Sequence, residues 1–142
     1  MIDYIHHNRL QLAIIIRSEY KKEGIEFFTN DNDSQQLGYM SRPEGYVISP
    51  HRHNLVSREV HLTQEVLLIK SGKVRVDFYD NEQHYIQSTI LEKGDVILLS
   101  DGGHGFKMLA PSEIIEVKQG PYCGEIDKVR FGSISDDRII LK

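Results

Sequence analysis

Short apolar runs separated by turn-forming residues are the dominant pattern of this 142-residue chain. Residues 13–16 (Ala-Ile-Ile-Ile) and 25–28 (Ile-Glu-Phe-Phe) are rich in β-branched and aromatic side chains, and residues 21–24 end in a glycine between them. Such runs favour two strands joined as a hairpin. A short helix within residues 10–20 is the alternative, because periodicity cannot distinguish helix from strand in so short a run. We therefore expect residues 1–36 to form an N-terminal β extension.

The same pattern of strands and turns continues over residues 37–131. Residues 74–78 (Val-Arg-Val-Asp-Phe) alternate apolar with polar side chains, which is typical of a strand with one buried face. The other expected strands are 37–40, 66–70, 85–91, 96–99, 106–109 and 114–117. Many short strands without an amphipathic helix predict an all-β, antiparallel barrel or sandwich. We expect one domain, with residues 132–142 as a C-terminal tail.

Net charge, the length of the apolar runs and the cysteine content indicate which partners and which cellular compartment to expect. The chain has 17 Lys and Arg against 21 Asp and Glu, a net charge of -4, which argues against a nucleic-acid partner held by phosphate contacts. The apolar run at residues 12–16 is too short to span a membrane or to form a signal-peptide core. Cys123 is the only cysteine, so no disulfide framework is expected. These features predict a cytoplasmic protein with no membrane partner.

Histidine and glutamate side chains with metal-ligand chemistry gather around residues 45–72. His51 and His53 are two positions apart, so on a strand they project from the same face, and Glu65 follows them. Two imidazoles and a carboxylate suffice to hold a divalent metal ion with open coordination positions. A further histidine, His104, lies in a glycine-rich bend. Mixed nitrogen and oxygen donors suit Fe, Mn, Ni or Zn.

The spacing of these residues resembles the two sequence motifs of the cupin superfamily. The first motif is Gly, five residues, His-x-His, three or four residues, Glu, six residues and Gly. The matching residues are Gly45, His51, His53, Glu65 and Gly72. The gap between His53 and Glu65 is seven or eight residues longer than the gap in the motif. The second motif is Gly, five residues, Pro-x-Gly, two residues and His. It is matched by Gly94 and Gly102, with Ser100 in place of proline and His104 one residue early.

The cupin resemblance covers residues 37–131 and implies both a fold and a site. Residues 116–122 and 127–128 are similar to the small cupin-fold metalloproteins associated with surface-polysaccharide (O-antigen) synthesis. The resemblance implies a single-domain jelly-roll β-barrel and, commonly, a dimer. It also implies one divalent metal ion, with the ligands His51, His53, Glu65 and His104. A homodimer is further expected because the N-terminal strands are apolar, the barrel core does not need them, and exposed sheet edges invite association.

The inserted segment, residues 54–64, separates the histidine pair from Glu65. It contains Arg58, whose planar guanidinium suits a bidentate contact with a carboxylate or phosphate, although a solvated surface role is the alternative. It also contains Val56, Val60 and Leu62. We expect the segment to pack through these apolar side chains, to form one wall of the pocket mouth and to contact an anionic group of a small-molecule ligand.

Two further residues are candidates for catalysis. His61 has the strand parity of Glu65, so it could replace a metal ligand or line the pocket; a surface position is the alternative. Lys118 and Glu116 lie on the same face of an expected strand. This face could point to solvent or into a polar barrel interior, and the resemblance favours the interior for Lys118.

Three functions are compatible with these residues. The first is a metal-dependent isomerase or epimerase acting on a small polar molecule such as a sugar or sugar nucleotide. The second is an Fe(II)-dependent dioxygenase. The third is a non-catalytic module that binds a metal ion and a ligand.

Overall fold

The computed structural model describes all residues from 1 to 142, and its fold is all-β. It contains ten strands in three antiparallel sheets, two short 3-10 turns and no α-helix. The structure has no helix with the length and apolar character that a membrane span requires. The chain divides into two compact units, which we describe separately: unit 1 is Met1–Tyr20 with Thr63–Lys142, and unit 2 is Lys21–Leu62. The all-β prediction is confirmed.

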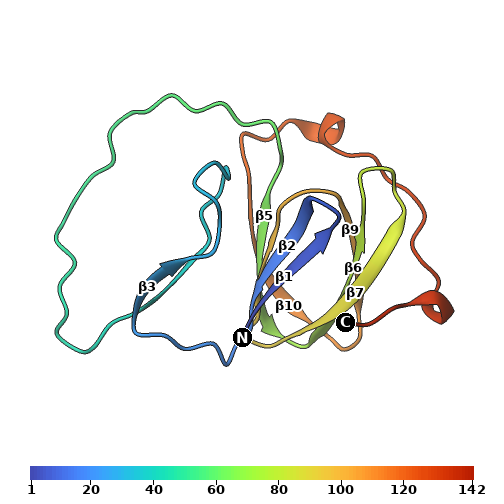
Figure 1. The fold of residues 1–142 in the computed structure, drawn as a ribbon, viewed down its shortest axis with the longest axis horizontal. Coiled ribbons are helices and arrows are strands. Elements are labelled where there is room, and N and C mark those ends of the chain that lie inside the picture. Colours follow the sequence, from blue (N-terminus) through green and yellow to red (C-terminus); the bar gives the residue numbers. More distant parts are fainter. The chain divides into compact units, whose positions relative to one another are not determined.

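Unit 1 contains two antiparallel sheets (Figure 1). The five-stranded sheet has the order β1 (Ile2–His7), β2 (Leu10–Ile16), β8 (Val96–Leu99), β5 (Glu65–Ser71), β10 (Glu113–Lys118). The three-stranded sheet has the order β7 (Tyr85–Glu92), β6 (Lys73–Tyr79), β9 (Gly103–Met108). Every strand expected from residues 66 to 117 is present, with bounds that differ by a few residues.

The two sheets of unit 1 pack face to face through one apolar core. Leu67 and Ile69 of β5 and Val76 and Phe78 of β6 are buried and belong to the same cluster. Because successive side chains of a strand point to opposite faces, the residues that alternate with these lie on the outer faces. Glu65 has the parity of Leu67 and Ile69, and it therefore points between the sheets.

The N-terminal strands are part of this core, which corrects the sequence-based prediction. Residues 13–16 lie in β2, which pairs with β1 and β8, and its Leu12, Ala13 and Ile15 are buried in the shared cluster. Residues 25–28 overlap β3 (Gly24–Phe27). The expected hairpin between the two runs is wrong, because β3 pairs with β4 (Gly38–Ser41) instead. The homodimer stays a prediction, but its argument from strands that the core does not need no longer holds.

The outer face of β6 is also buried, although the alternating sequence predicted one exposed face. Arg75 and Asp77 lie on this face and are almost inaccessible to solvent. A segment that we call the C-terminal strap, residues 132–142, crosses this sheet. The amide of Ile134 donates to the Tyr79 hydroxyl at 2.9 Å, and the amide of Ser88 donates to the Ile140 carbonyl at 2.8 Å. The polar face of β6 is thus covered by polar contacts with the strap.

Unit 2 contains one two-stranded sheet, β3 with β4, and residues 42–62 form no strand or helix. Within unit 2 the inserted segment has nothing against which to pack, and the expectation that it forms one wall of the pocket mouth stays a prediction. Its apolar side chains are all exposed: Leu55, Val56, Val60 and Leu62. A two-stranded sheet has no second layer of its own against which such side chains could pack.

Candidate functional site

Two of the predicted metal ligands, Glu65 and His104, meet between the sheets of unit 1. Glu65 opens β5 and is only 8% exposed. His104 lies on β9 opposite Phe78, whose side chain is in the core, so the imidazole faces the same interior. His104 Nε2 lies 3.3 Å from Glu65 Oε2. The structure therefore joins one residue from each motif, although His104 is one position early in the second motif.

A glycine just before His104 sets up this approach. Gly102 has a φ of +72°, a conformation that favours glycine, and a Cβ here would lie 2.6 Å from the Tyr79 carbonyl oxygen. The chain can therefore turn closely past the end of β6 before β9 begins. This local turn accounts for an inward-facing His104 despite the shifted spacing.

Lys118 completes a cluster of charged side chains around Glu65. It lies opposite Glu65 in the β5–β10 register, and its Nζ is 3.1 Å from Glu65 Oε1 and 2.9 Å from Glu116 Oε1. Ile114, on the same face of β10, packs against the core. Lys118 thus faces the space between the sheets, the orientation favoured from the sequence, and its side chain remains 35% exposed.

The contacts of Glu65 and Lys118 keep both groups charged at neutral pH. The hydrogen bond from His104, helped by Lys118, lowers the pKa of Glu65 to about 2, although burial of the carboxylate acts in the opposite direction. Hydrogen bonds to Glu116 and then Glu65 raise the pKa of Lys118 above its ordinary value. Glu65 can therefore act as an anionic ligand, whereas Lys118 can donate hydrogen bonds but is not a base.

The cluster lies at an open edge of the sandwich. β9 and β10 are edge strands of their sheets, and a short turn connects them. Phe106, two residues after His104, faces the interior opposite Val76, yet it is 37% exposed. Its ring centroid lies 5.5 Å from that of His104. We did not identify Phe106 from the sequence, although its spacing from His104 on an expected strand was a usable signal.

His51 and His53 form a second pair, in unit 2. They do not lie on a strand, so the expectation that a strand aligns them is wrong. Their ring centroids are nevertheless 5.3 Å apart, and the His51 Nδ1 lies 3.0 Å from the Ser49 carbonyl oxygen. No group of three or more His, Cys, Asp and Glu side chains is assembled to hold a metal ion. Because the two pairs belong to separately described units, the four-ligand site stays a prediction.

The other two candidates of the inserted segment are exposed. Arg58 makes no hydrogen bond or ion pair. His61 Nε2 lies 3.5 Å from Glu59 Oε1, and both side chains are largely in solvent. Within unit 2, His61 therefore corresponds to the surface alternative, and the anion contact of Arg58 stays a prediction.

The geometry of Glu65 and His104 fits two adjacent ligands of one metal ion. Two donors that each lie about 2.1 Å from a metal ion are about 3.0–3.4 Å apart at bond angles of about 90–110°. The measured separation of 3.3 Å between Glu65 Oε2 and His104 Nε2 falls in this interval. The other carboxylate oxygen holds Lys118. The oxygen and nitrogen donors that face each other thus suit a divalent cation.

Comparisons of the chain with protein-family models, with curated proteins and with solved structures find no match. The likeness to cupins therefore stays a prediction that rests on the two sequence motifs.

Proposed function

We propose that this chain is a cupin-type metalloprotein that holds one divalent metal ion and binds a small polar molecule beside it. The observation that carries the proposal is the contact between Glu65 and His104. These residues come from different sheets and different motifs, yet their ligand atoms lie 3.3 Å apart in the interior. His51 and His53 enter the proposal from their positions in the first motif.

The order of strands supports a jelly roll as the finer description of unit 1. From β5 onward, the chain crosses between the five-stranded and the three-stranded sheet four times: from β5 to β6, from β7 to β8, from β8 to β9 and from β9 to β10. Such crossings are what a two-sheet jelly roll requires. The shared apolar core is also consistent with this description.

Lys118 favours one of the three functions expected from the sequence. A divalent metal ion held by Glu65 and His104 would supply Lewis-acid chemistry toward a carbonyl oxygen. Lys118 is a cation held 3.1 Å from Glu65, and its exposed side chain can donate a hydrogen bond to an oxygen that gains negative charge. We therefore favour an isomerase or epimerase acting on a sugar or sugar nucleotide. Lys118 would stabilise the enediolate oxygen, and the base is not assigned.

The metal site is tested by the metal content and affinity of purified variants. The wild-type protein should bind one Fe, Mn, Ni or Zn ion per chain. His104→Ala and His51→Ala should each weaken binding by about a hundredfold, because each removes one of few donors. His6→Ala removes an exposed histidine of β1 and serves as the matched control. Full metal content in both folded ligand variants would refute the proposed site.

The catalytic assignment requires a separate assay on the metal-loaded protein. A panel of nucleotide sugars, followed by product analysis, should reveal an isomer, and Lys118→Gln should reduce turnover without reducing metal content. Oxygen uptake with bound iron would instead indicate the dioxygenase. Ligand binding without turnover would indicate the non-catalytic module. The homodimer and the anionic ligand remain further predictions.

A further inference from the structure

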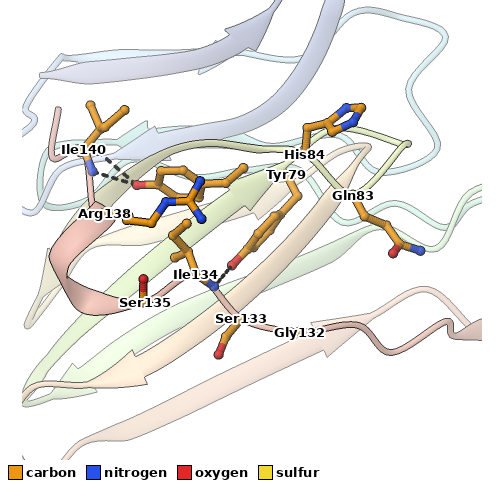
Figure 2. A pocket seen from close by; sticks show the side chains of 10 residues that line it. Tyr79, Gln83, His84, Gly132, Ser133, Ile134, Ser135, Arg138 and Ile140 are labelled. Atoms are coloured by element: carbon orange, nitrogen blue, oxygen red, sulfur yellow. Dashed lines mark hydrogen bonds between the residues drawn. The ribbon is translucent and has the colours of Figure 1, made fainter.

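A pocket of about 710 Å³ lies between the C-terminal strap and the β6–β7 hairpin. This volume falls within the range of about 300–1,000 Å³ that is usual for small-molecule sites. The turn between β6 and β7 contributes Gln83 and His84 to the lining, and the strap contributes Ser133, Ser135 and Arg138 (Figure 2). The pocket therefore exists only while the strap lies on the sheet.

This pocket is separate from the metal site proposed above. Tyr79, which lines it, directly follows Phe78 on β6, and consecutive side chains of a strand point to opposite faces. Phe78 faces the interior, where His104 lies opposite it, whereas Tyr79 faces the strap. A ligand in the pocket would thus lie on the outer face of the three-stranded sheet.

The polar groups of the pocket favour an anion. Arg138 is the only Lys or Arg among the lining residues, and none of them is Asp or Glu. Its guanidinium forms no ion pair or hydrogen bond within the chain, which leaves the fork available for a bidentate contact. The hydroxyls of Ser133 and Ser135 are on the same strap segment and also have no hydrogen-bond partner within the chain. A positive charge and hydroxyls without a partner therefore lie on one strap segment that lines the pocket.

The remaining walls are largely apolar. The rings of Tyr79 and Tyr85 lie edge to face, with centroids 5.7 Å apart, and Ile134 and Ile140 complete this side. Both tyrosine hydroxyls are held by the strap, since each accepts a hydrogen bond at 2.9 Å from the amide of one of these isoleucines. The wall is thus fixed in place, and it can pack against the organic body of a ligand.

We propose that this pocket binds a small organic anion, either a phosphate ester or a carboxylate. The charged group pairs with Arg138, and the organic body packs against Tyr85 and the strap isoleucines. Because the ligand contacts both the hairpin and the strap, its binding stabilises the closed strap by mass action. This inference does not depend on the metal or on the proposed catalysis.

The test uses the full chain and two probes of matched shape, phenyl phosphate and benzoate, in calorimetric titrations. Ligands of this size bind with a dissociation constant of about 1 mM when one charged group and one ring are engaged. Arg138→Gln should weaken the preferred probe by about tenfold or more, because it removes a charge-assisted hydrogen bond. Arg9→Gln removes the same charge from the exposed β1–β2 turn and should leave the affinity unchanged.

Amide hydrogen exchange supplies an independent readout of the site. The amides of Ile134 and Ile140 should exchange more slowly when the probe is bound, because both hydrogen bonds open when the strap lifts. A preference for phenyl phosphate would identify a phosphate ester as the ligand, and a preference for benzoate would identify a carboxylate.

The proposal is overturned if neither probe binds, if Arg138→Gln binds as tightly as the wild type, or if exchange at the two amides does not change. Since the Arg138 side chain makes no hydrogen bond or ion pair within the chain, the variant should unfold at the wild-type urea midpoint. If the midpoint falls, Arg138→Lys keeps the charge without the planar fork, and it must then restore part of the affinity.

Discussion

Asp77 is the residue whose replacement should destabilise the fold most clearly. Its carboxylate is only 3% exposed, and it accepts hydrogen bonds from Arg75 Nε at 2.8 Å, Arg75 Nη2 at 3.0 Å and Ser88 Oγ at 2.5 Å. The hydrogen bonds to Asp77, and then the one to Asp136, raise the pKa of the Arg75 guanidinium, which is itself buried. Asp77→Asn preserves the shape of the side chain but removes its charge, and it leaves Arg75 with Asp136 as its only anionic partner.

The expected loss follows from the burial of this pair. Removing one partner of a buried ion pair costs about 3–5 kcal/mol, because an uncompensated charge remains. Asp136 Oδ1 stays 2.8 Å from Arg75 Nη1, so part of the charge is still neutralised. We therefore expect Asp77→Asn to lower the free energy of unfolding by about 3 kcal/mol, near the lower end of that range.

Asp136→Asn provides the matched control, because it removes a different carboxylate from the same guanidinium. Asp136 is 61% exposed, so solvent screens its pairs with Arg75 and Lys107, and we expect a loss of only about 0–1 kcal/mol. With a urea m-value of about 1–3 kcal/mol per molar, the Asp77 variant should unfold about 1–3 M earlier. The reasoning is refuted if the two variants shift the urea midpoint equally.

Two further predictions concern Glu65 and Gly72. The pKa of Glu65 is about 2 in the folded chain, against an ordinary value of 4.5. The ionised carboxylate therefore contributes its full share to the free energy of unfolding above about pH 4.5, and this share disappears as the pH falls through 2. In the metal-free protein this share is at most about 3 kcal/mol. As the pH is lowered from 4.5 to 2, the urea midpoint of Glu65→Gln should therefore fall less steeply than the midpoint of the wild-type protein. Gly72→Ala should destabilise by well over 1 kcal/mol, because φ is +89° and the added Cβ would lie 2.3 Å from the Pro111 carbonyl. Gly124→Ala, with a φ of +71° but nothing within 4 Å, should lose only about 1 kcal/mol, and equal losses in urea unfolding would contradict the steric argument.

The positions of the strands from residue 65 onward were predictable, because they depend on local patterns, whereas β1 was not among the expected strands. β-branched and aromatic runs bounded by turn residues located β6, β7 and β8 within a few residues. The pairing of β2 was not predictable in the same way. Its partner β8 lies far along the chain, whereas the sequence pattern favoured the nearest run as a hairpin partner.

For the candidate site, only the resemblance to the cupin motifs predicted that Glu65 and His104 are neighbours. The fold brings His104 Nε2 to 3.3 Å from Glu65 Oε2. The alternation on β10 left two orientations for Lys118, and the register opposite Glu65 selected the inward one. His51 and His53 could be recognised by their spacing, but their expected strand is absent.

What the sequence determined by itself was therefore the class of fold and the residues with ligand chemistry. Hydrophobic periodicity predicts which face of a strand is buried, and this pattern can be read from a few neighbouring residues. Only the tertiary structure decided what covers each side. The polar face of β6 is buried because Asp136 and the rest of the strap return to Arg75 from the far end of the chain. Such contacts join residues distant in sequence, and no local pattern encodes which distant segment will supply the partner.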